Sequence, residues 1–143
     1  MNIINIIIEV NLFLIYNYIG DVMDCIFCKI INGDIPSYTL YENDYVKCFL
    51  DVNPSSNCHT LIVPKKHFKD AYDIDSEYIS EIHKASKIIL EMIDSKFKPS
   101  GYKLVQNNGN LQDVKHYHLH IIPSYSGKQK NIKVDEVFEI LTK

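Results

Sequence analysis

Three histidines alternate with apolar or aromatic residues toward the C-terminal end of the chain. They are His116, His118 and His120, in the run His-Tyr-His-Leu-His-Ile-Ile-Pro. Alternate side chains of an extended strand point to the same side, so the three imidazoles should share one face. Imidazole titrates near neutral pH and can act as an acid, a base or a nucleophile. Crowding three of them is unfavourable unless a metal or an anion offsets their charge, so the motif predicts a reactive or ligand-holding site.

A second group of chemically capable residues begins near residue 25. Cys25 and Cys28 form a Cys-x-x-Cys motif, and His67 and His116 complete a Cys₂His₂ set. Four such ligands occupy every position of a tetrahedral zinc ion, as in structural zinc sites. We predict such a site here. His59 is an alternative fourth ligand. The competing interpretation is a metal-free cluster of buried thiols beside neutral imidazoles.

The composition favours one compact domain and limits how the chain could hold phosphate. The chain has 143 residues and a formal net charge of -3, and all 15 basic residues are Lys. A length of this order suits a single core. The near-neutral balance excludes the broad basic face of a general nucleic-acid binder. Without Arg, phosphate must be held by His, Lys, hydroxyl or backbone N–H groups.

Residues 1–22 form an apolar leader of uncertain role, and residues 23–143 form the predicted domain. Glu9 interrupts the apolar run, and no Lys or Arg precedes it, so a cleaved secretory signal is disfavoured. Three alternatives stay open: a membrane anchor, a segment that packs on the domain, or translation that starts at Met23. We therefore expect a cytoplasmic protein, which could also enter the nucleus, with no membrane contact unless the leader is an anchor. In such a reducing compartment Cys48 and Cys58 should be buried thiols.

The elements that must position these residues follow from hydrophobic periodicity and turn residues. The pattern predicts about five strands, one long helix and short helices near both ends of the domain. The expected strands are 38–42, 46–51, 59–64, 102–107 and 116–123, and the expected helices are 25–32, 76–97 and 134–141. Most connections are too short for parallel crossovers. The predicted fold class is therefore α+β with an antiparallel sheet.

Several motifs, in order along the chain, closely resemble the histidine triad (HIT) family and its Hint-like branch of nucleotide-binding proteins. Besides the triad they are Asp-Cys-Ile-Phe-Cys-Lys-Ile-Ile from residue 24, Gly-Asp-Ile-Pro-Ser from 33, Phe-Leu-Asp from 49, His-Thr-Leu-Ile-Val-Pro-Lys-Lys-His from 59 and Asn-Asn-Gly from 107. The similarity covers nearly all of residues 24–123. It implies a HIT-like fold, and some zinc-containing members use positions that match the predicted ligands.

The resemblance implies a hydrolase of the adenosine 5′-monophosphoramidase type. His118 would attack the α-phosphorus of a purine nucleoside 5′-phosphoramidate and form a nucleotidyl-histidine intermediate, while a backbone carbonyl near His116 holds the other ring nitrogen. His120 would donate to phosphate oxygens. Two alternatives stay open. One is a dinucleoside polyphosphate hydrolase or nucleotidyl transferase with the same covalent His. The other is a weakly catalytic nucleotide-binding or scaffold protein.

The resemblance also suggests nucleotide contacts and an assembly. Asp51 would accept hydrogen bonds from the ribose hydroxyls, and Asn107 would lie near the sugar and phosphate. Phe27, Ile30 and Phe49 would contact the base, although simple core packing is the alternative for all three. Relatives of this branch pair through the long helix and a neighbouring strand, so a homodimer is expected.

Two departures from the family pattern bear on activity. The motif before the triad usually reads Gly-Gln-Ser/Thr-Val, whereas this chain has Leu-Gln-Asp-Val from residue 111. Asp113 therefore replaces a hydroxyl that would contact phosphate, and its carboxylate would repel the substrate unless it pairs with Lys115 or turns away. Gln112 could take over the contact. Ser124 stands where many relatives carry Arg.

Overall fold

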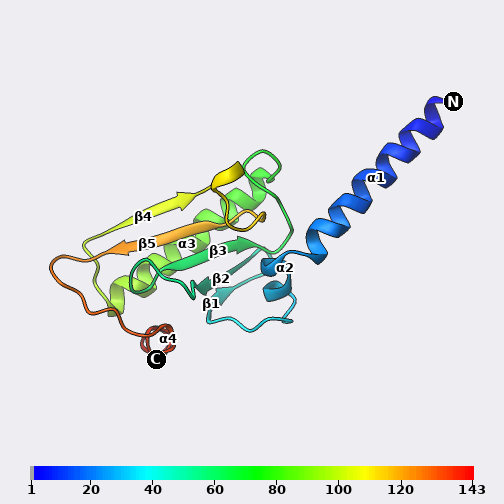
Figure 1. Cartoon of the computed structure of the whole chain (residues 1–143). Helices are drawn as coiled ribbons and strands as arrows, with labels where there is room; N and C mark the ends of the chain where they lie inside the picture. Colours follow the sequence, from blue (N-terminus) through cyan, green and yellow to red (C-terminus); the bar gives the residue numbers. More distant parts are fainter. Residues whose placement is uncertain (1) are drawn as a thin grey trace.

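The computed structural model describes residues 2–143 and contains a five-stranded antiparallel sheet. Its spatial order is β1-β2-β3-β5-β4, so the last two strands are exchanged relative to their sequence order. The strands are β1 (Thr39–Glu42), β2 (Val46–Leu50), β3 (Thr60–Pro64), β4 (Gly101–Gln106) and β5 (Leu119–Ser124). This architecture confirms the predicted α+β class (Figure 1).

One face of the sheet is covered by the long helix α3 (Ser76–Lys96), which runs behind the strands in Figure 1. Its apolar residues recur at helical spacing, and Ile82, Ala85, Ile89 and Ile93 are buried. They pack with inward residues of β2 and β3, such as Ile62, in the main hydrophobic core. The C-terminal helix α4 (Val134–Thr142) adds Val137 and Leu141 to the same core.

The opposite face of the sheet carries a smaller core beneath the short helix α2 (Ile26–Ile31). The alternation of strand side chains assigns residues to the two faces. On β3, Ile62 belongs to the main core, whereas Leu61 and Val63 belong to the smaller one. Phe27 and Ile30 of α2 pack there as well. The predicted functional residues lie on this second face.

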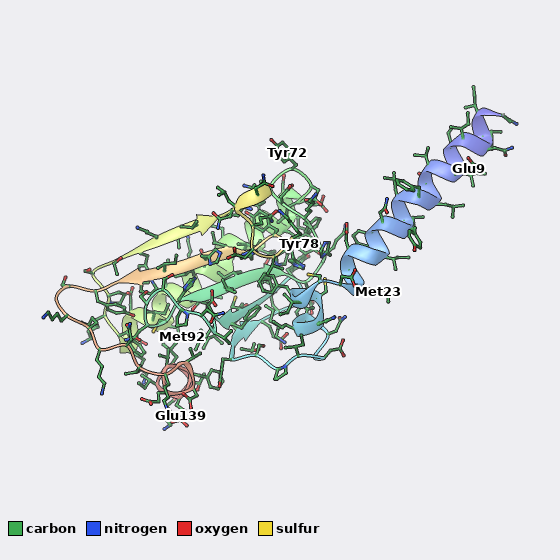
Figure 2. The ribbon with its side chains drawn as sticks, in the orientation of Figure 1. Glu9, Met23, Tyr72, Tyr78, Met92 and Glu139 are labelled. Carbon is green, nitrogen blue, oxygen red and sulfur yellow. The ribbon has the colours of Figure 1, made fainter. Side chains whose placement is uncertain are left out.

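The leader folds as one continuous helix, α1 (Ile3–Met23), and it does not pack along the domain. None of its residues is buried, and Figures 1 and 2 show it extending away from the sheet. Its contacts with the domain lie in its last turns, where the Tyr18 ring meets His67 and Val22 packs against the smaller core. Within residues 2–143, α1 is the one helix that is long and apolar enough to cross a membrane.

The fifth strand begins three residues later than expected. His116 was predicted to open it, but β5 starts at Leu119. The reason lies in the backbone partners of the preceding residues. The Tyr117 N–H donates to the carbonyl of Phe68 at 2.7 Å, and the His116 carbonyl accepts from the side chain of His118. These backbone groups form hydrogen bonds with partners that are not neighbouring strands, so pairing with β3 begins only at Leu119.

Candidate active site and metal centre

A pocket of about 430 Å³ opens on the face of the sheet that carries α2. Its size is typical of small-molecule sites. Most of the predicted site residues line it, although they come from distant parts of the chain. They are Phe27, Ile30, Phe49, Asp51, Asn107, Asp113, His118 and His120. Gln112 and His116 do not belong to the lining.

His118 is held in one tautomer by the backbone of the triad segment. Its Nδ1–H donates to the carbonyl oxygen of His116 at 2.7 Å, so the lone pair of the neutral ring lies on Nε2. The ring packs edge-on against Phe27, with centroids 5.0 Å apart. Burial lowers the pKa of His118, although the carbonyl of His116 opposes the shift. A neutral, oriented imidazole at a pocket wall is suited to nucleophilic attack.

His120 is part of a chain of hydrogen bonds through His59. The backbone N–H of Ser55 donates to His59 Nδ1 at 3.0 Å, which places the proton of a neutral His59 on Nε2. His59 Nε2 lies 3.0 Å from His120 Nδ1 and donates to it. His120 therefore carries its own proton on Nε2, where it can serve as a donor.

The structure corrects the alternative assignment of His59 as a metal ligand of the cysteine cluster. Its Nε2 lies 3.6 Å from Asp51 Oδ2, so it belongs to the pocket. Burial lowers the pKa of His59, and Asp51 opposes that change. No local sequence spacing connects His59 with His120. They meet because β3 pairs with β5 so that Leu61 lies opposite His120.

The apolar wall of the pocket is also part of the smaller core. Phe27 and Phe49 meet edge-on at 5.8 Å between ring centroids, and both are buried with Ile30. The two interpretations offered for these residues are therefore compatible, because one side chain can fill the core and face the pocket. Asp51 follows β2 and accepts the N–H of Asn53 at 2.9 Å through Oδ1.

Gln112 lies elsewhere than predicted. Its Nε2 donates to the carbonyl of Lys69 at 2.6 Å, and its buried Oε1 has no hydrogen-bond partner within residues 2–143. Its neighbour Asp113 lines the pocket instead. Lys115 does not neutralise that carboxylate, since its Nζ donates to the carbonyl of Gly109 at 2.5 Å. The carboxylate raises the pKa of His118, against the larger effect of burial.

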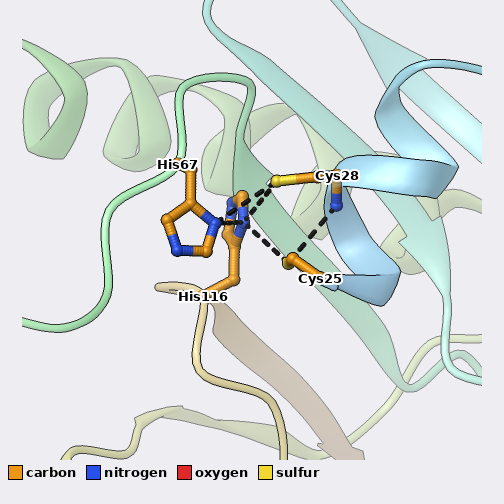
Figure 3. A group of neighbouring side chains, drawn as sticks. All are labelled: Cys25, Cys28, His67 and His116. Carbon is orange, nitrogen blue, oxygen red and sulfur yellow. Dashed lines mark hydrogen bonds between the residues drawn. The ribbon is translucent and has the colours of Figure 1, made fainter. Parts of the chain in front are cut away.

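The remaining triad histidine, His116, joins the cysteines behind the pocket (Figure 3). Its Nδ1 lies 3.4 Å from Cys25 Sγ and 3.1 Å from His67 Nδ1, and Cys28 Sγ lies 3.3 Å from His67 Nδ1. All four side chains are buried, and their ligand atoms lie within 4.8 Å of one another. Zn–S and Zn–N bonds in a tetrahedron place neighbouring ligand atoms about 3.3–3.8 Å apart. The cluster is close to those dimensions.

The protonation of His116 also suits a metal. Its Nε2–H donates to the carbonyl of Pro64 at 2.9 Å, so the Nδ1 lone pair faces the two sulfur atoms. A histidine that binds a metal is commonly held in this way, by a hydrogen bond from its other ring nitrogen to a backbone carbonyl. Burial lowers the pKa of His116 to about 4. The side chain is thus a neutral ligand at physiological pH.

Comparison with known proteins identifies the family of this chain. The HIT domain profile matches residues 32–127. The chain belongs to the HIT family. A HIT-like protein from Methanocaldococcus jannaschii is 44% identical over 115 residues, which are 79% of this chain and 88% of the relative. An adenosine 5′-monophosphoramidase from Candida albicans is 41% identical over 105 residues, which are 69% of each chain.

The solved structures of HIT proteins place the fold in the same family. A zinc-bound HIT protein from Mycobacterium smegmatis superimposes with a TM-score of 0.77 at 28% identity, covering 84% of this chain and 91% of the other. With its HIT fold and its enzymatic relatives, this chain is a HIT-type hydrolase. The triad of this HIT protein is divided, with His118 and His120 in the pocket and His116 in the cysteine cluster.

Proposed function

We propose that this protein hydrolyses the P–N bond of purine nucleoside 5′-phosphoramidates through a covalent nucleotidyl-His118 intermediate. The observation that carries the proposal is the 2.7 Å hydrogen bond from His118 Nδ1–H to the His116 carbonyl. It leaves Nε2 as the nucleophilic nitrogen of a ring at the pocket wall. The phosphoramidase name of the Candida albicans relative supports this choice of reaction.

The reaction divides into two displacements at phosphorus. His118 Nε2 attacks the α-phosphorus, the P–N bond breaks, and the departing nitrogen takes a proton from the solvent and leaves as an amine; the attacking water of the second step returns one proton to the solvent. Water then attacks the same phosphorus, which breaks the His118–phosphorus bond and releases the nucleoside monophosphate. His120 Nε2–H donates to the phosphate oxygens as charge grows on them, and this donor matters more because the chain has no Arg.

The rest of the pocket provides the nucleotide contacts. Asp51 and Asn107 both line the pocket. Asp51 would accept hydrogen bonds from the ribose hydroxyls, and Asn107 would lie near the sugar and phosphate. Phe27 and Phe49 offer an apolar surface to the base. The pocket encloses a single small ligand, so we propose a nucleotide rather than a nucleic acid as the partner.

The experiment that tests this function follows amine release from an adenosine 5′-phosphoramidate that carries a fluorogenic amine. We expect turnover by the parent protein and none above background with His118→Ala. Samples quenched in alkaline denaturant, in which a histidine–phosphorus bond survives, should contain protein labelled by the nucleotide on His118. Turnover that survives His118→Ala would exclude the covalent mechanism.

A second candidate function is a nucleotide-binding protein with weak catalysis, and Asp113 is the observation that favours it. The carboxylate lines the pocket without Lys115 as a partner, so it would repel the anionic substrate. Tight binding of AMP by the parent protein with negligible turnover would support this candidate. Cleavage of dinucleoside polyphosphates with little phosphoramidate turnover would favour the dinucleoside polyphosphate hydrolase.

We further propose that the cysteine cluster binds a structural zinc ion. The four buried side chains would supply all four ligands of a tetrahedral ion, so none of its positions would be open for a substrate. When bound, zinc would join the start of α2 to the triad segment. Metal analysis of protein purified without chelators should give about one zinc per chain.

A homodimer and a reducing compartment complete the proposal. The strand β4 is an edge of the sheet, and its Leu104 side chain is exposed. Exposed apolar side chains of α3, such as Ile79 and Ile88, could join it in an interface. All four cysteines are free thiols, as suits a domain in the cytoplasm or nucleus. Light scattering of the purified protein tests the dimer.

A further inference from the structure

The helix α1 is the largest feature of the chain that the hydrolase site does not use. Its apolar residues surround the whole helix, and none of them is buried. Glu9 and Asp21 are its only charged residues. In α3 and α4, by contrast, the apolar residues form one face that packs into the domain core. Exposure of so many large apolar groups to water is unfavourable, so α1 requires an apolar environment.

The dimensions of α1 identify that environment. Its 21 residues rise about 1.5 Å each and give a length of about 31 Å, which places its last turns, where Tyr18 and Val22 contact the domain, at the edge of a bilayer core roughly 30 Å thick. A helix that lies on a membrane surface needs one apolar face and one polar face rich in Lys or Arg. This helix contains no Lys and no Arg. Its character therefore fits a spanning segment.

The few polar residues of α1 are arranged in a way that a bilayer tolerates. Asn5, Glu9 and Tyr16 lie along one narrow stripe of the helix, whereas Asn11 and Asn17 lie on other sides of it, and Asp21 lies in the last turn near the domain. Polar residues inside membranes usually turn toward another helix or a polar partner. Tyr16 and Tyr18 lie toward the C-terminal end, where aromatic side chains favour the headgroup level.

We propose that α1 is a membrane-spanning anchor that inserts into a lipid bilayer and holds the hydrolase domain at the membrane surface. The junction with the domain suits this arrangement. Val22 packs against the smaller core, and the Tyr18 ring meets His67 edge-on at 6.1 Å. Lys65 and Lys66 line a hollow beside Tyr18, where they also pair with Glu42 and Asp75. The domain thereby stays in the aqueous, reducing compartment.

Vesicle flotation of the full-length chain tests the anchor. The protein, purified in mild detergent, is reconstituted with neutral phosphatidylcholine vesicles, floated on a density gradient and washed with alkaline carbonate. Leu14→Lys places a charge near the middle of α1, and Tyr72→Lys places the same charge on a loop residue that is 96% exposed. A parallel sample without lipid reports self-association.

We expect the parent chain and Tyr72→Lys to float and to resist carbonate. The fraction of Leu14→Lys that floats should be lower by about tenfold or more. Both variants should keep the amine-release activity of the parent in detergent, which separates a folding defect from lost insertion. The anchor is refuted if the parent stays at the bottom of the gradient or is released by carbonate. Equal flotation of Leu14→Lys, or α1-dependent oligomers that exclude lipid, would refute it too.

Discussion

His59 Nε2 lies 3.0 Å from His120 Nδ1, so the proton on one imidazole determines the tautomer of the other. Ser55 donates its backbone N–H to the far nitrogen of His59, which gives the chain of hydrogen bonds one direction. His120 consequently has its proton on Nε2 and lines the pocket, so in the proposed reaction it would present an N–H to the substrate instead of a lone pair. His59 acts through His120 and is a positioning residue.

Replacing His59 should slow the chemical step. We expect His59→Ala to lower kcat about 10–100-fold with little change in KM, because His120 loses the partner that fixes its proton. Steady-state kinetics on the fluorogenic phosphoramidate measure both constants. His83→Ala is the matched control, since His83 is an exposed histidine of α3. A rise in KM with unchanged kcat would assign His59 to substrate binding instead.

Removing the charge of Asp113 should improve use of the substrate. Two unit charges about 4 Å apart repel by about 1 kcal/mol in water and by more in a partly buried pocket. Asp113→Asn should therefore raise kcat/KM by about fivefold or more. Lys115→Ala should have a much smaller effect, because Lys115 donates to the Gly109 carbonyl rather than to Asp113. A lower kcat/KM for Asp113→Asn would show that the carboxylate helps the reaction.

Removal of metal should destabilise the fold around the cysteine cluster. A strong chelator is expected to lower Tm by about 10 °C or more, because structural zinc contributes several kcal/mol to folding. Cys28→Ser should lower Tm without chelator and make the protein insensitive to it. Cys48→Ala is the control, since Cys48 is buried in the main core away from the cluster. If the parent and Cys28→Ser respond alike to the chelator, the cluster holds no stabilising metal.

The pH dependence of catalysis should reflect the buried triad. Burial lowers the pKa of His118, so this nucleophile stays neutral below the value of about 6.5 typical of free imidazole. We expect kcat/KM to stay level as pH falls from 8 to about 6.5 and to decline only at lower pH. A decline centred at or above pH 7 would contradict a nucleophile with a lowered pKa.

The free energy of unfolding should also depend on the protonation of the buried histidines. The pKa values of His59, His118 and His120 are all lowered by burial in the folded chain. The unfolded chain therefore binds more protons below about pH 6.5, and stability decreases as pH falls from there. Denaturant unfolding at pH 7.5 and 5.5 measures the change. His83→Ala should leave this difference unaltered, because His83 is exposed.

Much of this protein can be predicted from local sequence patterns. The long amphipathic helix, the short apolar strands and the turn residues between them define an α+β fold. The triad and the Cys-x-x-Cys motif identify reactive residues because their spacing is short and regular. Such patterns depend only on how side-chain directions repeat within one helix or strand.

The tertiary structure determined which of those residues meet. His116 and His118 are two positions apart, yet one faces the cysteines and the other faces the pocket, because the His116 ring donates to the carbonyl of Pro64 and the His118 ring donates to the carbonyl of His116. His59 joins His120 through the pairing of β3 with β5. Gln112 turns to the Lys69 carbonyl. Contacts between distant elements depend on strand register and on the burial of polar groups, which a local pattern does not specify.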